Sequence, residues 1–182
     1  MADSDREFAP AVYLITGIQA AGKSTVAQAL AERLPRSAHV RGDVFRRFVV
    51  GGRREMSPQP DPEALAQLRL RHRLAARTAD EYASAGFTAV VQDVVLGDML
   101  PYLIGEIRTD PLYVVVLAPS PAAVEAREAA RAKTAYGTFT VADLDTGLRE
   151  TTPPLGLWLD SSDLTVEQTV DAILAEATPI AR

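Results

Sequence analysis

The run GIQAAGKST at residues 17–25 constrains the fold of this chain more than any other segment. It fits the spacing G-x-x-x-x-G-K-S, in which two glycines stand five positions apart and the second precedes a lysine and a serine. Residues 11–16 before the run are apolar and partly β-branched, which is typical of a buried strand. Residues 24–34 after it repeat apolar side chains every four positions, which indicates an amphipathic helix. The sequence therefore predicts a strand, a glycine-rich loop and a helix in direct succession.

This arrangement is suited to holding phosphate. Glycines let successive backbone N–H groups curl around an anion, and the N-terminus of the helix adds positive partial charge. Lys23 is expected to reach the β- and γ-phosphates of a nucleotide such as ATP, and the Ser24 hydroxyl to ligate Mg²⁺. The alternative is a plain glycine-rich turn, which the flanking strand and helix disfavour. The residues expected to contact the nucleotide are Gly17, Ala21, Gly22, Lys23, Ser24 and Thr25.

Composition narrows the class of protein. The 182 residues suffice for one domain over residues 1–182, preceded by an acidic and flexible stretch at residues 1–10. The hydrophobic fraction of 47% is ordinary for a globular protein, and the absence of cysteine excludes disulfides and cysteine-ligated zinc. No signal peptide is evident and no apolar run approaches 18 residues. We expect a cytoplasmic protein with no membrane partner; its oligomeric state stays open.

Strand and helix patterns alternate along the chain. After the first strand, further strand patterns fall at residues 37–43, 87–93, 111–119 and 155–160. Helical patterns cover residues 24–34, 44–50, 62–85, 97–107, 120–133, 141–150 and 165–177. Asp61 and Pro62 are suited to start the longest helix, and Pro101 is expected to interrupt the fourth. Such alternation predicts an α/β fold, a five-stranded parallel sheet with helices on both faces.

Aspartates end three of the five predicted strands. The carboxyl ends of parallel strands form the binding edge of such sheets, so Asp43, Asp93 and Asp160 are candidate site residues. Asp43 is expected to take the proton of an acceptor hydroxyl, and the alternative is that it caps the next helix. Asp93 is expected to hold Mg²⁺ or to orient the substrate, and the alternative is an ordinary loop aspartate.

Arginine is concentrated in one segment. Between Arg41 and Arg77 lie nine arginines against four acids, although the whole chain carries a net charge of −5. The local excess suggests an anionic partner, or else a solvated helix face. Arg41 and Arg46 flank Asp43 and are the residues expected to contact an acceptor. His72 lies among these arginines and is expected to face solvent.

A second basic segment follows the fourth predicted strand. Arg127 and Arg131 are four residues apart and share a helix face, and Lys133 is one of only two lysines, with Lys23. In a kinase this segment is the lid that closes over the phosphates, so residues 127–140 are expected to form a lid with Arg131 as a catalytic residue. The alternative is that these side chains form salt bridges with acidic neighbours on the same helix.

The segments ITGIQAAGKST, VVQDVVLGD, VVVLAPSPAAVEAREAAR and WLDSSDLTVEQTVDAIL together resemble the P-loop small-molecule kinases. Within these, the chain is most similar to the chloramphenicol phosphotransferase-like proteins. The resemblance implies the strand order 2-3-1-4-5, a lid after the fourth strand and Asp43 as the acceptor-activating base. It further implies that Arg127 lies against the nucleotide and that residues 160–162 border the adenine.

Two departures from that family concern the acceptor. The family has paired acids where this chain has Gln92 and Asp93, and its acceptor-binding stretch does not resemble the arginine-rich residues 45–74. We therefore do not expect chloramphenicol itself to be the substrate. The resemblance implies an ATP- and Mg²⁺-dependent kinase that phosphorylates a hydroxyl of an antibiotic-, sugar- or nucleoside-like molecule. The alternatives are a polynucleotide 5′-hydroxyl kinase, disfavoured by the negative net charge, and a regulatory nucleotide-binding module.

Overall fold

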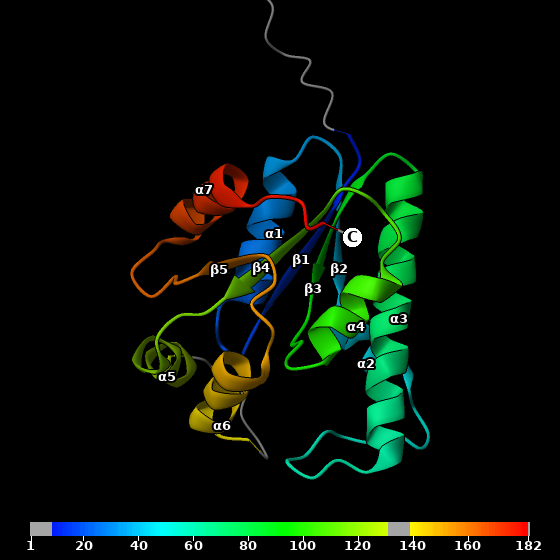
Figure 1. The fold of residues 1–182 in the computed structure, drawn as a ribbon, viewed down its shortest axis with the longest axis vertical. Helices are drawn as coiled ribbons and strands as arrows, with labels where there is room; N and C mark the ends of the chain where they lie inside the picture. Colours follow the sequence, from blue (N-terminus) through cyan, green and yellow to red (C-terminus); the bar gives the residue numbers. More distant parts are fainter. Residues whose placement is uncertain (1–8, 131–138, 182) are drawn as a thin grey trace, which may run out of the picture.

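The computed structural model describes residues 9–130 and 139–181 and builds them around one parallel sheet (Figure 1). Five strands pair in the order β2-β3-β1-β4-β5, so the predicted fold class and strand order are confirmed. The strands are β1 Val12–Gly17, β2 Ser37–Arg41, β3 Thr88–Gln92, β4 Leu112–Leu117 and β5 Leu157–Leu159. Their carboxyl ends point toward α5, α6 and the loop between α2 and α3, in the lower half of Figure 1.

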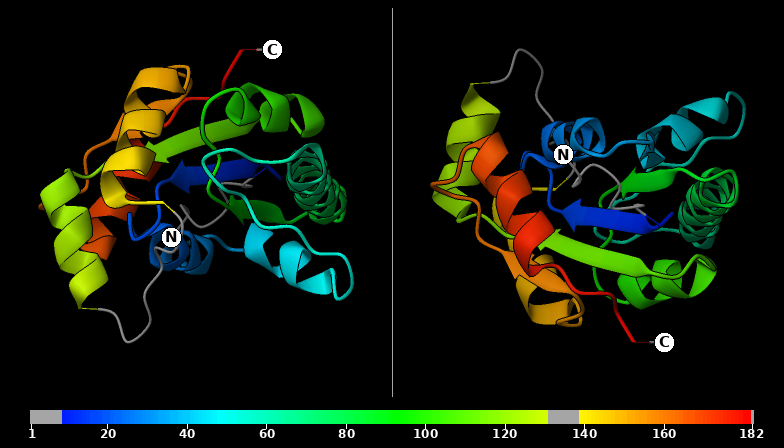
Figure 2. Two further views of the ribbon diagram at one scale, coloured as in Figure 1. Left: turned by 90° about the horizontal axis from the view of Figure 1, so that it is seen from below. Right: turned by 90° about the horizontal axis from the view of Figure 1, so that it is seen from above.

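Helices cover both faces of the sheet. The helices are α1 Lys23–Arg33, α2 Gly42–Phe48, α3 Pro62–Ser84, α4 Met99–Glu106, α5 Pro121–Ala129, α6 Val141–Thr146 with the π-helical turn η1 Gly147–Thr151, and α7 Val166–Glu176. Helix α1 packs with α7, and α3 packs with α4. Figure 2 shows α1 and α4 on opposite faces of the sheet. Among the helices described, none combines the length and the apolar character that a membrane crossing requires.

The central strands form the core because both of their faces are covered. In β1, β3 and β4 nearly every side chain is buried, which explains why their sequences read as unbroken apolar runs rather than as alternating patterns. The small side chains of Ala75, Ala76 and Ala79 let α3 approach the sheet closely, and all three are fully buried. The core therefore lies beneath the carboxyl edge of the strands and gives that edge a rigid base.

Helix starts follow the predicted capping residues. The Asp61 carboxylate accepts a hydrogen bond from the Ala64 amide at 2.7 Å, with Pro62 at the first helical position. The expected interruption at Pro101 is wrong, since α4 runs unbroken from Met99. Pro101 is the third residue of this helix, where a backbone N–H would have no acceptor inside the helix, so proline costs little there.

The junction between β2 and α2 lies two residues earlier than predicted. Strand β2 ends at Arg41 and α2 begins at Gly42, so Asp43 occupies the first helical turn rather than the end of a strand. A Cβ atom at position 42 would overlap the Asp93 carboxylate. Glycine at this position therefore lets α2 begin directly against the end of β3.

Candidate active site

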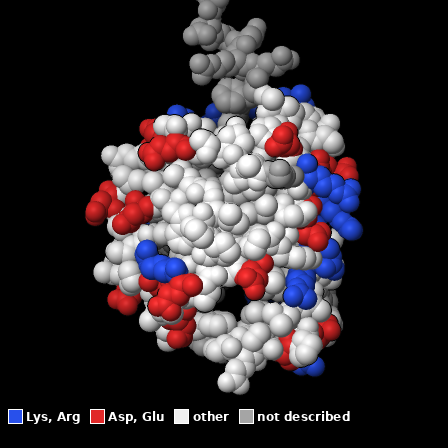
Figure 3. Space-filling view, in the orientation of Figure 1, with Lys and Arg blue, Asp and Glu red and all other residues white. Residues whose placement is uncertain are grey.

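A cavity of about 1290 Å³ lies at the carboxyl edge of the sheet. Its wall combines the loop between β1 and α1 with α2, α3, the segment after β3, Arg127 of α5 and the start of α7. Figure 3 shows the molecule hollowed in its lower half, between the sides of α6 and α3. This is the edge at which open α/β sheets bind their ligands.

The glycine-rich loop has the backbone that its sequence predicts. Gly17 has a φ of +141°, and a Cβ atom there would overlap the carbonyl oxygen of Leu117 in β4. Gly22 has a φ of +95° at the residue before α1. Lys23 is 7% exposed, and its ammonium group donates a hydrogen bond to the Ile18 carbonyl at 2.6 Å, across the loop. The loop and its lysine thus line the cavity as a ready anion site.

Ser24 and Asp93, the predicted Mg²⁺ ligands, have different partners. The Ser24 hydroxyl donates to the Gln92 side-chain oxygen at 2.6 Å. Asp93 is 1% exposed and accepts hydrogen bonds from the Arg71 guanidinium, with 2.6 Å between Arg71 Nε and Asp93 Oδ2. The Val94 amide also donates to this carboxylate, at 2.7 Å. Gln92 therefore faces the nucleotide loop, while Asp93 joins the end of β3 to α3.

His72 is fully buried, so the expectation that it faces solvent is wrong. Its Nε2 atom lies 3.9 Å from Asp93 Oδ2, and neither ring nitrogen has a hydrogen-bond partner. Burial lowers the pKa of His72 to about 4, which outweighs the opposing effect of the nearby Asp93 carboxylate. Helical spacing from Ala75 and Ala76 places His72 and Arg71 on the buried side of α3, a signal that the concentration of arginines obscured.

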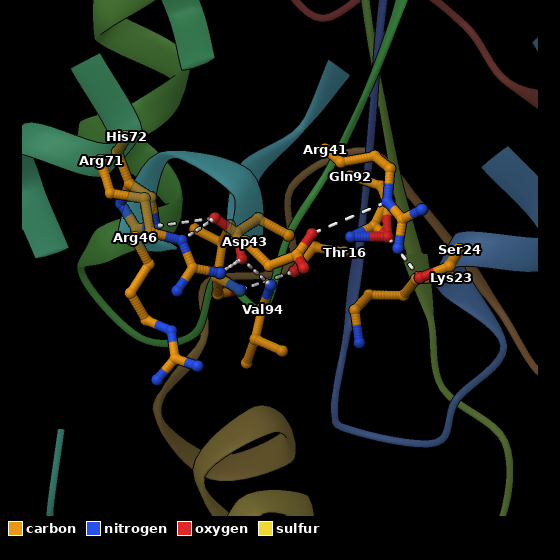
Figure 4. A network of polar contacts seen from close by, with 12 residues as sticks. Thr16, Lys23, Ser24, Arg41, Asp43, Arg46, Arg71, His72, Gln92 and Val94 are labelled. Carbon is orange, nitrogen blue, oxygen red and sulfur yellow. Dashed lines mark hydrogen bonds and ion pairs between the residues drawn. The ribbon is translucent and has the colours of Figure 1, made fainter. Parts of the chain in front are cut away.

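Asp43 lines the cavity and contacts two arginines. Its carboxylate accepts a hydrogen bond from Arg47 Nη2 at 3.0 Å and lies 3.7 Å from Arg41 Nε. No side-chain hydrogen bond caps α2, so the alternative of a helix cap does not describe Asp43. In the view of Figure 4, Asp43 lies between the Arg71 and His72 side and the side that holds Ser24.

The arginines of residues 41–77 divide into two groups. Arg41 and Arg46 line the cavity as predicted, although Arg46 forms an ion pair with Glu55. On the other side of α3, Arg73 donates to the Tyr102 hydroxyl at 3.1 Å and Arg69 lies over the same ring. Arg69 and Arg73 therefore pack against α4 and are not part of the cavity wall.

Arg127 joins the two segments that the resemblance placed around the nucleotide. Its guanidinium donates to the Ala21 carbonyl at 3.2 Å and to the Ser161 carbonyl at 2.5 Å. The glycine-rich loop and residues 160–162 are thereby held on one side of the cavity. Arg131, Lys133 and most of the predicted lid lie outside the described residues.

Comparison with known proteins supports the fold. The sequence pattern of one family, described as an AAA domain, matches residues 12–100, just under half of the chain. A search among curated proteins finds no match.

Solved kinase structures align over most of the chain. A sugar kinase from Janibacter sp. is 19% identical with a TM-score of 0.69, over 92% of this chain and 93% of that one. APS kinase of Mycobacterium tuberculosis, in complex with AMPPNP and APS, is 16% identical with a TM-score of 0.67, over 92% and 96%. The tunicamycin resistance protein of Deinococcus radiodurans is 17% identical with a TM-score of 0.62, over 95% and 99%. The chain thus has the fold of the P-loop kinases.

Proposed function

We propose that this protein is an ATP-dependent phosphotransferase that moves the γ-phosphate to a hydroxyl group of a small molecule. One observation carries the proposal: a single cavity is lined both by Lys23 and Ser24 of the phosphate loop and by the carboxylate of Asp43. A nucleotide on the loop would place its terminal phosphate toward an acceptor beside Asp43. The kinase fold of the aligned structures agrees with this reading.

The nucleotide half of the cavity supplies positive charge. The loop amides and Lys23 would surround the β- and γ-phosphates, and Arg127 would lie beside them. The oxygen atoms of Ser24 and Gln92 are hard donors that suit Mg²⁺, which binds through few protein ligands together with nucleotide phosphates. Bound Mg²⁺ would neutralise charge on the phosphates. The Asp93 carboxylate already accepts hydrogen bonds from Arg71. We therefore propose that Asp93 holds Arg71 in position at the acceptor half of the cavity.

The acceptor half contains the base. Asp43 would take the proton of the acceptor hydroxyl as the bond from its oxygen to the γ-phosphorus forms and ADP leaves. Contacts with Arg41 and Arg47 hold this carboxylate in place. The products are the phosphate ester, ADP and the proton.

Two substitutions test the proposal by separating nucleotide binding from transfer. ADP release is measured across a panel of sugars, nucleosides, aminocyclitols, antibiotics and RNA 5′ ends. Lys23→Ala should lower kcat by at least about 10²–10³, since it removes charge stabilisation of the transferred group. Asp43→Asn should lower kcat by roughly 10²–10⁴ and leave nucleotide affinity nearly unchanged. Arg77→Ala is the matched control, because Arg77 is exposed and lies outside the cavity.

Three results would contradict this proposal in different ways. Turnover of Lys23→Ala near the wild-type value would remove the phosphate-loop assignment. Phosphorylation confined to RNA 5′ ends would indicate the polynucleotide kinase alternative. Tight nucleotide binding without transfer to any acceptor would indicate a regulatory module.

A further inference from the structure

The acceptor half of the cavity has an apolar wall. Helices α2 and α3 and the loop between them contribute side chains that line it without joining the hydrophobic core. These are Phe48, Met56, Leu65, Leu68 and Leu74. Phe48 is 69% exposed, and its ring meets the Phe45 ring edge-on at 6.0 Å. The other four side chains are half-buried. Phe48 is therefore the most exposed part of an apolar surface that opens to the cavity, and apolar surface gathered in one place often marks a ligand or partner site.

The position of helix α3 explains why Leu65 and Leu68 are only half-buried. Its middle and C-terminal turns bury Ala75, Ala76 and Ala79 against the sheet. Its N-terminal turns extend beyond the sheet edge, in the lower part of Figure 1, where no strand lies beneath them. Leu65 and Leu68 of these turns face the cavity instead. The length of α3 therefore accounts for the part of the apolar wall that Leu65 and Leu68 form.

Three arginines in the same region already have carboxylate partners. Arg46 and Arg53 both pair with Glu55, the latter at 3.2 Å between Arg53 Nε and Glu55 Oε1. Arg71 is held by the buried Asp93 carboxylate. An anionic acceptor would have to compete with these carboxylates, whereas an apolar group would meet side chains with no competing partner.

The size and continuity of the cavity favour a small molecule as its occupant. Sites for drug-sized ligands usually measure about 300–1,000 Å³, and this cavity of about 1290 Å³ is larger because it spans both the phosphate loop and the acceptor half, which leaves room for a nucleotide and a small acceptor together. It is continuous with the phosphate loop, so an acceptor can present a hydroxyl to Asp43 while its remainder lies on the apolar wall. On the basis of the proposed function, we infer that the acceptor is an alcohol with a large apolar part, such as an aromatic ring or a branched alkyl group.

A matched pair of alcohols tests this inference. 3-Phenylpropane-1,2-diol and glycerol share a vicinal diol and differ at the third carbon, where a phenyl group replaces the third hydroxyl of glycerol. With ATP and Mg²⁺, kcat/KM should be at least tenfold higher for the phenyl diol, since burial of an aromatic group contributes more than one factor of ten. Phe48→Ser should lower kcat/KM for the phenyl diol about tenfold and leave kcat/KM for glycerol unchanged. Val50→Ser, at a 95% exposed apolar residue outside the cavity, should change neither.

A binding measurement keeps the test independent of turnover. The neutral fluorophore N-phenyl-1-naphthylamine should bind saturably to the protein loaded with ADP and Mg²⁺. The phenyl diol should displace it and glycerol should not. Phe48→Ser should weaken fluorophore binding about tenfold, whereas Val50→Ser should not. Absence of saturable fluorescence would overturn the inference.

Other outcomes separate this inference from the proposed function. Transfer to glycerol or sugars with a kcat/KM equal to or above that of the phenyl diol would overturn the apolar acceptor and leave the phosphotransferase intact. Fluorophore binding together with no ADP formation from ATP in the presence of any alcohol would refute the phosphotransferase, and the acceptor site with it. A loss of dimers on Phe48→Ser, seen by sedimentation, would show that the apolar wall joins two copies of this chain.

Discussion

His72 is held as a neutral ring inside the protein, beside the ion pair of Arg71 and Asp93. The Asp93 carboxylate favours the imidazolium, whereas burial and the adjacent Arg71 guanidinium disfavour it. Burial is the largest of these effects and brings the pKa to about 4. The neighbouring arginines suggested a solvated side chain, but the position of His72 on α3 decides its environment.

The pKa of His72 predicts that acid destabilises the fold. Between pH 6.5 and 4 the unfolded chain binds a proton at this residue that the folded protein does not, so stability falls as the pH drops through this range. When His72 is protonated in both states, the free energy of unfolding has fallen by about 3 kcal/mol because of this group. Urea unfolding of wild type and His72→Phe at pH 7 and pH 4.5 measures it. Equal pH dependence in both proteins would show that His72 does not carry this effect.

At the scale of elements, strand alternation assigns the two residues at the end of β3 to opposite partners. Gln92 meets Ser24 of α1, and Asp93 meets Arg71 of α3. The sequence predicts that Asp93 holds Mg²⁺ or orients the substrate and indicates no role for Gln92, because the sequence alone does not show which way the chain turns after a strand. The contact of Gly42 with Asp93 adds α2 to the same junction. The end of β3 and the helices α2 and α3 thus meet at one buried carboxylate.

Removal of one partner from this junction should be costly. Arg71→Met leaves the Asp93 carboxylate buried without its cation, which typically costs about 3–5 kcal/mol. The double variant with Asp93→Asn should recover a large part of that loss. Arg33 and Asp171, an exposed pair at 3.0 Å between α1 and α7, provide the control, and Arg33→Met should cost less than about 1 kcal/mol. Denaturant unfolding compares the variants, and similar losses for Arg71→Met and Arg33→Met would contradict a structural role for the buried pair.

At the scale of the whole molecule, local signals predicted the architecture well. The phosphate-loop spacing, the apolar runs and the cap at Asp61 depend on neighbouring residues, and the structure confirms the strand, loop and helix, the buried strands and the cap. The acceptor wall was not predictable in this way. It depends on how far α3 extends past the sheet and on contacts such as Arg71 with Asp93, which are 22 residues apart. The arginine count suggested an anionic site, because pairing with acids cannot be seen in a sum of charges.

The candidate nucleotide site joins distant parts of the chain, so nucleotide binding should stabilise the whole fold. Arg127 links Ala21, near the start of the chain, with Ser161, near its end. A ligand that binds only the folded state at 100 times its Kd adds about 2.7 kcal/mol. For a domain of this size, that corresponds to a rise in Tm of roughly 5–10 °C. Thermal unfolding with ADP and Mg²⁺ should show this rise in wild type and in Phe48→Ser, but a much smaller rise in Lys23→Ala at the same concentrations. An unchanged wild-type Tm at millimolar nucleotide would contradict nucleotide binding at this loop.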